Sequence, residues 1–142
     1  MLHLIGAVPP EMTPLLAKSR SIIKRPFLED SALQAAYLGA RALVLPSEIE
    51  GFGLPAVEAY YLGTPVCFVS GTSVEEVLGV ATEKGAFSLD SRTSLFTALE
   101  EVMGMSADEI HACGLELRKN YATRVVTEKM LMAFRSLHAS RR

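Results

Sequence analysis

Two glutamates flank a glycine-containing turn near the middle of the chain. Glu50 directly precedes Gly51-Phe52-Gly53-Leu54, and Glu58 follows Glu50 after seven intervening residues. The turn enters a helical pattern with Pro55 in its first turn, where proline fits. Backbone N–H groups at the start of a helix carry about half a positive charge and suit phosphate or sugar hydroxyls. Because carboxylates accept hydrogen bonds from vicinal hydroxyls, the two acids could face one cleft that binds a sugar and a ribose.

A Gly-x-Gly turn before a helix is weak evidence by itself. Tight strand-to-helix turns use glycine for backbone reasons in many places without function. The histidines give no alternative site, since His3, His111 and His138 are scattered and have no nucleophile or acid at a useful spacing. We expect them to be surface or packing residues, with no catalytic triad and no metal site.

The elements that position the turn alternate between two kinds. Short apolar runs without polar alternation predict strands covered on both faces, as in a parallel sheet. They fall at residues 2–5, 21–24, 42–45, 66–69 and, more weakly, 86–89. Between them, helical patterns cover residues 10–18, 30–39, 54–62 and 74–78. This order predicts an α/β fold with a doubly wound parallel sheet.

The C-terminal third predicts further helices at residues 92–103, 107–120 and 123–138. The last of them carries apolar residues at three- and four-residue spacing, which make one amphipathic face. These residues are Val125, Val126, Met130, Leu131, Phe134 and Leu137. We expect this face to be packed rather than to bind a partner.

Length and composition describe one ordinary domain. The chain has 142 residues, is 49% hydrophobic, and carries 14 basic and 16 acidic side chains for a net charge of -2. Without a basic surplus, a general nucleic-acid binder is disfavoured. No apolar run is long enough to span a membrane, and no signal peptide is expected. Cys67 and Cys113 are expected to be reduced, packed thiols, as in the cytoplasm.

The combined motif is more specific than its parts. The pattern Pro46-Ser47-x-x-Glu50-Gly51-Phe52-Gly53-Leu54-Pro55-x-x-Glu58-Ala59 is followed by Gly63-Thr64-Pro65-Val66. It resembles the donor-binding signature of the retaining glycosyltransferases of the GT-B fold, the group 1 or family 4 class. The resemblance implies a Rossmann-like lobe with extra C-terminal helices. It also implies a hexosyltransferase-like enzyme of polysaccharide biosynthesis that uses no cofactor or metal.

The resemblance also implies roles for single residues. Glu50, with the amides of Gly51 and Phe52, matches positions that bind the donor sugar. The amides of Gly53 and Leu54 match those at the diphosphate, and Glu58 matches the glutamate at the ribose.

The base would lie near Arg25 and Pro26. Pro26 replaces a glycine of the family pattern, which leaves the identity of the base open between UDP, GDP and ADP donors. No catalytic residue of this chain is assigned.

The resemblance covers only part of a two-lobed enzyme. Residues 1–142 match the donor-binding lobe, without the N-terminal lobe that would hold the acceptor and without the first strand and helix of the donor lobe. In the doubly wound order 3-2-1-4-5-6 that first strand is central, so its loss leaves a gap. A shift of the strand at residues 2–5, or dimerisation through an open sheet edge, could fill it.

Two functions remain open at this point. The chain is either the donor-binding half of a retaining glycosyltransferase, inactive alone, or a non-catalytic fragment that binds a nucleotide or a partner. The full-length protein would be cytoplasmic, and peripheral attachment to a membrane is left open.

Overall fold

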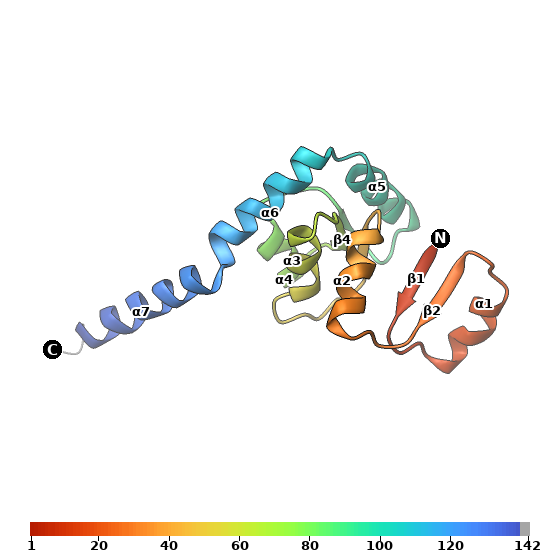
Figure 1. Cartoon of the computed structure of the whole chain (residues 1–142), viewed down its shortest axis with the longest axis horizontal. Helices are drawn as coiled ribbons and strands as arrows, with labels where there is room; N and C mark the ends of the chain where they lie inside the picture. The colour runs from red at the N-terminus through yellow and green to blue at the C-terminus, as the bar shows by residue number, and fades with distance from the viewer. Residues whose placement is uncertain (140–142) are drawn as a thin grey trace. The chain divides into compact units, whose positions relative to one another are not determined.

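The computed structural model describes residues 1–139, which form two compact units at residues 1–36 and from residue 37 onward (Figure 1). The first unit begins with strand β1 (Leu2–Ile5), a 3-10 turn (Pro10–Met12), helix α1 (Thr13–Ala17) and strand β2 (Ile22–Arg25). Helix α2 (Asp30–Gly39) starts in this unit and ends in the second. The predicted helix at 10–18 is split, and Pro14, which lacks an N–H, stands in the first turn of α1.

The first unit is a small parallel sheet. β1 and β2 pair in parallel from Leu2 opposite Ile22 to Ile5 opposite Arg25. The prediction that these strands are covered on both faces is wrong for β1, where Leu2 and Ile5 are 47% and 43% exposed. Two strands in a unit of this size do not provide enough surface to cover both faces.

The second unit contains a three-stranded parallel sheet in the order β3-β4-β5. Its strands are β3 (Leu43–Leu45), β4 (Val66–Val69) and β5 (Ala86–Phe87). All four residues of β4 are buried, as predicted for a central parallel strand. β5 is shorter than the predicted run because the N–H of Ser88 donates to Ser94 Oγ, at 2.8 Å, and so does not extend the ladder.

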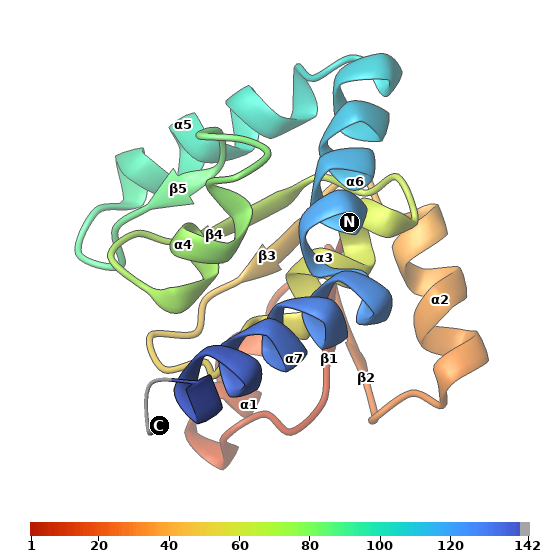
Figure 2. The same cartoon turned by 90° about the vertical axis from the view of Figure 1, so that its left-hand side faces the viewer.

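Five helices follow or connect these strands. They are α3 (Leu54–Tyr61), α4 (Ser73–Leu78), α5 (Arg92–Met103), α6 (Ala107–Tyr121) and α7 (Thr123–Ala139). α3 packs against β3 and β4, and α5 packs against β4 and β5. α3 and α6 lie side by side (Figure 2), and a Cβ on Gly114 of α6 would come within 2.8 Å of the backbone oxygen of Tyr60. Only glycine permits that approach.

The core of the second unit is formed where these helices meet the sheet. Its largest fully buried side chains are Tyr60, Phe68, Leu78 and Leu117. The α/β class, the parallel strands and the additional C-terminal helices agree with the prediction, although the strands form two sheets. No helix among the described residues is both long and apolar enough to cross a bilayer.

The apolar face of α7 is not packed, so that expectation is wrong for the described chain. Val125 is partly buried, but every residue from Val126 to His138 is exposed. The main contact of α7 is with α6, which precedes it directly. A helix that continues away from its unit leaves most of its surface in solvent.

Candidate functional site

The turn between β3 and α3 requires glycine at position 53. Gly53 is the N-cap of α3 and has a left-handed backbone, with φ 77° and ψ 43°. A Cβ at this position would lie 2.7 Å from Cγ2 of Val74 in α4. Both the backbone angles and the space therefore exclude larger residues. Pro55 stands in the first turn of α3, as predicted.

Gly51 is under no such constraint. Its φ is not positive, and a Cβ there would meet nothing within 4 Å. The purely structural explanation of the Gly-x-Gly turn therefore applies to Gly53 but not to Gly51. An exposed glycine without a steric reason leaves room for a ligand to approach the backbone.

The backbone donors of this turn are free within the protein. The N–H groups of Ala56 and Val57 both donate to the carbonyl oxygen of Gly53, at 2.9 and 3.4 Å. The N–H groups of residues 51 to 54 donate to no acceptor in the described part of the chain. Gly53 also has no side chain that could cap them. Four consecutive donors at a helix start can bind phosphate oxygens or sugar hydroxyls.

Ser73 fixes the backbone of Glu50. Its Oγ donates to the carbonyl oxygen of Glu50 at 2.7 Å. Ser73 begins α4 directly after the loop that follows β4, and Glu50 lies in the loop that follows β3. Because adjacent parallel strands end at the same edge of the sheet, the two loops meet there. Sequence analysis missed Ser73, although its place after a buried strand was an available signal.

The side chain of Phe52 packs rather than facing a ligand. Its ring meets the ring of Tyr121, the last residue of α6, edge to face with centroids 5.1 Å apart and planes at 86°. Burial raises the pKa of Tyr121, and the charge of Glu76 raises this pKa further. Only the backbone of Phe52 is thus left for binding. Tyr121 was also missed, because nothing in the local pattern links it to the turn.

Glu58 lies in the second turn of α3 and is exposed. Its charge adds to the effect of burial in raising the pKa of Tyr37, a buried residue near the end of α2. In residues 1–139, Glu58 forms no ion pair and no side-chain hydrogen bond. Its carboxylate oxygens are therefore free to accept hydrogen bonds from a ligand.

Arg25 and Pro26 belong to the first unit, whereas the turn belongs to the second. Arg25 ends β2, and its carbonyl oxygen accepts a hydrogen bond from the N–H of Gly6 at 3.1 Å. Both residues are exposed. Their role at the base stays a prediction.

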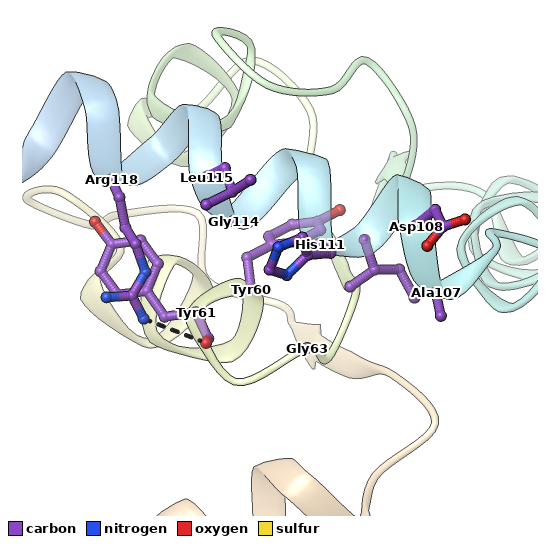
Figure 3. A pocket seen from close by; sticks show the side chains of 10 residues that line it. Tyr60, Tyr61, Gly63, Ala107, Asp108, His111, Gly114, Leu115 and Arg118 are labelled. Atoms are coloured by element: carbon purple, nitrogen blue, oxygen red, sulfur yellow. Dashed lines mark hydrogen bonds between the residues drawn. The ribbon is translucent and has the colours of Figure 1, made fainter.

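A hollow of about 680 Å³ lies elsewhere, between the end of α3 and α6 (Figure 3). Among the residues that line the hollow, the guanidinium of Arg118 stacks over the ring of Tyr61, with Cζ 4.3 Å from the ring centroid. Nη2 of Arg118 also donates a hydrogen bond to the carbonyl oxygen of Tyr61 at 3.4 Å. None of the predicted donor-site residues lines this hollow. This hollow therefore does not coincide with the predicted donor site.

The three histidines and the two cysteines have the surface or packed positions that were expected for them. His3, His111 and His138 are exposed. Cys67 and Cys113 are free and buried. The pKa of Cys67 is raised to about 11, mainly by burial and to a smaller extent by the charge of Glu101. Such thiols are unreactive at neutral pH. Within residues 1–139, no three His, Cys, Asp or Glu side chains are grouped as metal ligands.

Comparisons with known proteins match the part of the chain that contains this turn to a family model. The model of the family described as "Glycosyl transferases group 1" matches residues 20–86. The O-antigen chain mannosyltransferase B of Escherichia coli is 46% identical over 55 residues, which are 39% of this chain and 14% of that protein. The chain thus spans a small part of this relative.

A solved structure shows the same fold. Sucrose-phosphate synthase from Thermosynechococcus elongatus matches with a TM-score of 0.75 at 19% identity, over 98% of this chain and 39% of that one. At this identity the likeness concerns the fold. Residues 20–86, which contain the whole turn from Glu50 to Glu58, thus match the group 1 glycosyl transferases, on the fold of a Rossmann-like GT-B lobe.

Proposed function

We propose that this chain is the donor-binding lobe of a retaining glycosyltransferase, which transfers a sugar from a nucleotide-diphosphate sugar to an acceptor. The observation that carries the proposal is the set of free N–H groups at residues 51 to 54, placed between Glu50 and Glu58. Donors at a helix start are complementary to a diphosphate, and flanking carboxylates are complementary to hydroxyls. The match of residues 20–86 to the group 1 family supports this reading.

Each group would have a separate task. The carboxylate of Glu50 would accept hydrogen bonds from the donor sugar, close to the N–H groups of Gly51 and Phe52. Those of Gly53 and Leu54 would bind the diphosphate and stabilise its charge as it departs, without a metal. Glu58 would accept hydrogen bonds from the ribose hydroxyls. Ser73 would act as a positioning residue, because it holds the backbone of Glu50.

The lobe would work as part of a longer protein. The chain covers only 14% and 39% of the two matched proteins. The pairing of β1 with β2 and the series β3-β4-β5 are compatible with the doubly wound order 3-2-1-4-5-6 if its first strand is missing. We therefore propose that the acceptor binds a further lobe and that residues 1–142 alone show no turnover.

Calorimetric titration with UDP, GDP and ADP and their sugars tests donor binding. We expect one nucleotide to bind, and Glu58→Ala to weaken this binding about 10-fold or more, since a hydrogen bond to a charged group contributes about 1.5–3 kcal/mol. Glu48→Ala is the matched control, because Glu48 is an exposed acid of the same turn. It should leave the affinity unchanged.

A second comparison separates the two acids. Glu50→Ala should weaken the binding of the sugar nucleotide more than the binding of the free nucleotide. Glu58→Ala should weaken the binding of both equally. Equal losses in Glu50→Ala would show that Glu50 does not contact the sugar. No binding of any of the three nucleotides, by a sample with native helix content, would refute donor binding by this chain.

A further inference from the structure

The turn between β3 and α3 is held at two points by the start of α4. Ser73 Oγ donates to the carbonyl oxygen of Glu50 at 2.7 Å, and Gly53 lies against the side chain of Val74. Within the part of the chain that the structure describes, the N–H groups of residues 51 to 54 form no hydrogen bond that would fix the backbone between these points. A segment without such bonds keeps one conformation only where side-chain contacts hold it.

Phe52 supplies a side-chain contact between those two points. Gly51 and Gly53 have no side chain, and that of Leu54 is 60% exposed. Phe52 is instead half-buried, and its ring meets the ring of Tyr121 edge to face, with centroids 5.1 Å apart and planes at 86°. This geometry is a favourable one for two aromatic rings. The position of the free N–H groups therefore depends on the contact between the two rings.

Tyr121 is well placed to support the turn because α6 packs closely against α3. Gly114, Leu117 and Tyr121 recur at three- and four-residue spacing and so lie on one face of α6. On this face Leu117 is fully buried, and the lack of a side chain at Gly114 lets α6 approach the backbone of Tyr60. The face continues to Tyr121, the last residue of α6, whose ring reaches Phe52. Both rings belong to the second unit, so the contact forms within this lobe.

We propose that Tyr121 is a positioning residue for donor binding. Its ring would hold Phe52, and through Phe52 the N–H groups of residues 51 to 54, in the arrangement that meets the ligand. The inference rests on the proposed function, because it takes these N–H groups to bind the donor. Without the ring, the turn would populate further conformations, and the apparent affinity would fall with the fraction that can bind. The strength of an aromatic pair sets this loss at about 2- to 10-fold.

Calorimetric titration of the 142-residue chain with UDP, GDP and ADP tests the proposal. Tyr121→Ala should weaken binding of the preferred nucleotide about 2- to 10-fold. Tyr121→Phe keeps the ring and should restore the affinity of the unchanged chain. Such a rescue separates the ring contact from the hydroxyl group.

The matched control is Tyr61→Ala. Tyr61 is also half-buried, and its ring also contacts α6, through Arg118 with Cζ 4.3 Å from the ring centroid. It lies at the opposite end of α3 from the turn. Tyr61→Ala should therefore lower the urea midpoint of unfolding much as Tyr121→Ala does, but it should leave nucleotide affinity unchanged.

A double-mutant cycle shows whether the two rings act together. Phe52→Ala should also weaken nucleotide binding, and the double variant F52A/Y121A should lose no more than the larger of the two single losses. Independent effects would instead add. Additive losses, unchanged affinity in Tyr121→Ala, equal losses in Tyr121→Ala and Tyr61→Ala, or no rescue by Tyr121→Phe would each overturn the proposal.

Nuclear magnetic resonance on chain with isotope-labelled glycine measures the turn without a ligand. In Tyr121→Ala, the order parameters of the Gly51 and Gly53 N–H groups should fall toward the flexible range below about 0.6, while that of Gly63 should not change. Unchanged values at Gly51 and Gly53 would overturn the proposal. No nucleotide binding by the unchanged chain would refute the proposed function, whereas binding that Tyr121→Ala leaves intact would refute the positioning role alone.

Discussion

Two helices of the second unit, α3 and α6, begin in opposite ways. At the start of α6, Ser106 Oγ accepts a hydrogen bond from the N–H of Glu109 at 3.2 Å, and Glu109 Oε2 accepts one from the N–H of Ser106 at 2.8 Å. This capping box satisfies two backbone donors with side chains. At the start of α3, Gly53 has no side chain, and the donors of residues 51 to 54 remain free.

The difference shows where backbone N–H groups remain available to a ligand. A side-chain cap stabilises a helix by about 1 kcal/mol, so α3 forgoes a contribution that α6 obtains. A ligand that accepts hydrogen bonds from the free donors would supply a comparable stabilisation when it binds. The presence of glycine does not by itself indicate such a site, whereas four consecutive free donors between two carboxylates support one.

Replacing Gly53 should have the largest effect. Gly53→Ala forces a side chain into a left-handed backbone and against Val74, at 2.7 Å from its Cγ2. We expect the free energy of unfolding to fall by about 2–4 kcal/mol, from backbone strain and overpacking together. Urea denaturation measures this loss. A change below about 0.5 kcal/mol would show that the turn can relax and that its geometry is not fixed.

Removing the cap of α6 should have a smaller effect and one of a different kind. Ser106→Ala deprives the N–H of Glu109 of its acceptor and should lower the free energy of unfolding by about 1 kcal/mol. Nucleotide affinity, measured by calorimetry, should not change, because α6 contains none of the proposed donor-site residues. A loss of affinity comparable to that in Glu58→Ala would contradict the contrast between the two helix starts.

The capping box should also make the free energy of unfolding depend on pH. Two contacts lower the pKa of the exposed Glu109 to about 2, from an ordinary value of 4.5. The larger contribution is the hydrogen bond from the N–H of Ser106, and the next is the hydrogen bond from Lys84 Nζ, 3.0 Å from Glu109 Oε1. The stabilisation from this carboxylate is therefore present above about pH 4.5 and is lost as the pH falls toward 2.

Urea midpoints of the unchanged chain and Glu109→Gln, measured between pH 6 and 2.5, test this expectation. The difference between the two proteins should shrink as the pH falls. A constant difference over this range would show that the charge of Glu109 does not contribute.

Gly51→Ala should have the smallest effect on stability and so gives the sharpest test of the α3 turn. A Cβ at this position meets nothing within 4 Å, so the free energy of unfolding should change by less than about 0.5 kcal/mol. The added methyl group would, however, obstruct a ligand at the neighbouring N–H groups. Calorimetry should show weaker nucleotide binding, and unchanged binding would place the ligand away from Gly51.

The sequence predicted the local elements well. The strand Val66–Val69 and the helix Arg92–Met103 have the predicted bounds, because buried parallel strands and amphipathic helices produce distinct apolar patterns. The site turn was also found from its sequence, since Gly-x-Gly followed by proline specifies a strand-to-helix turn. These features depend on residues that are neighbours in the chain.

Contacts between distant residues could not be read in the same way. The hydrogen bond from Ser73 to Glu50 and the ring contact between Phe52 and Tyr121 join separate elements. The pattern of α7 correctly predicted a helix but wrongly predicted that its apolar face is packed. An apolar stripe specifies that something should cover it, but not which surface does so.

The sequence by itself determined the order of strands and helices and the turn with its two acids. Only the tertiary structure decided which N–H groups remain free, which glycine is required by space, and which apolar side chains are exposed. The physical reason is the range of the forces involved. Backbone preferences act between near neighbours, whereas burial and hydrogen-bond satisfaction depend on elements that meet only after folding.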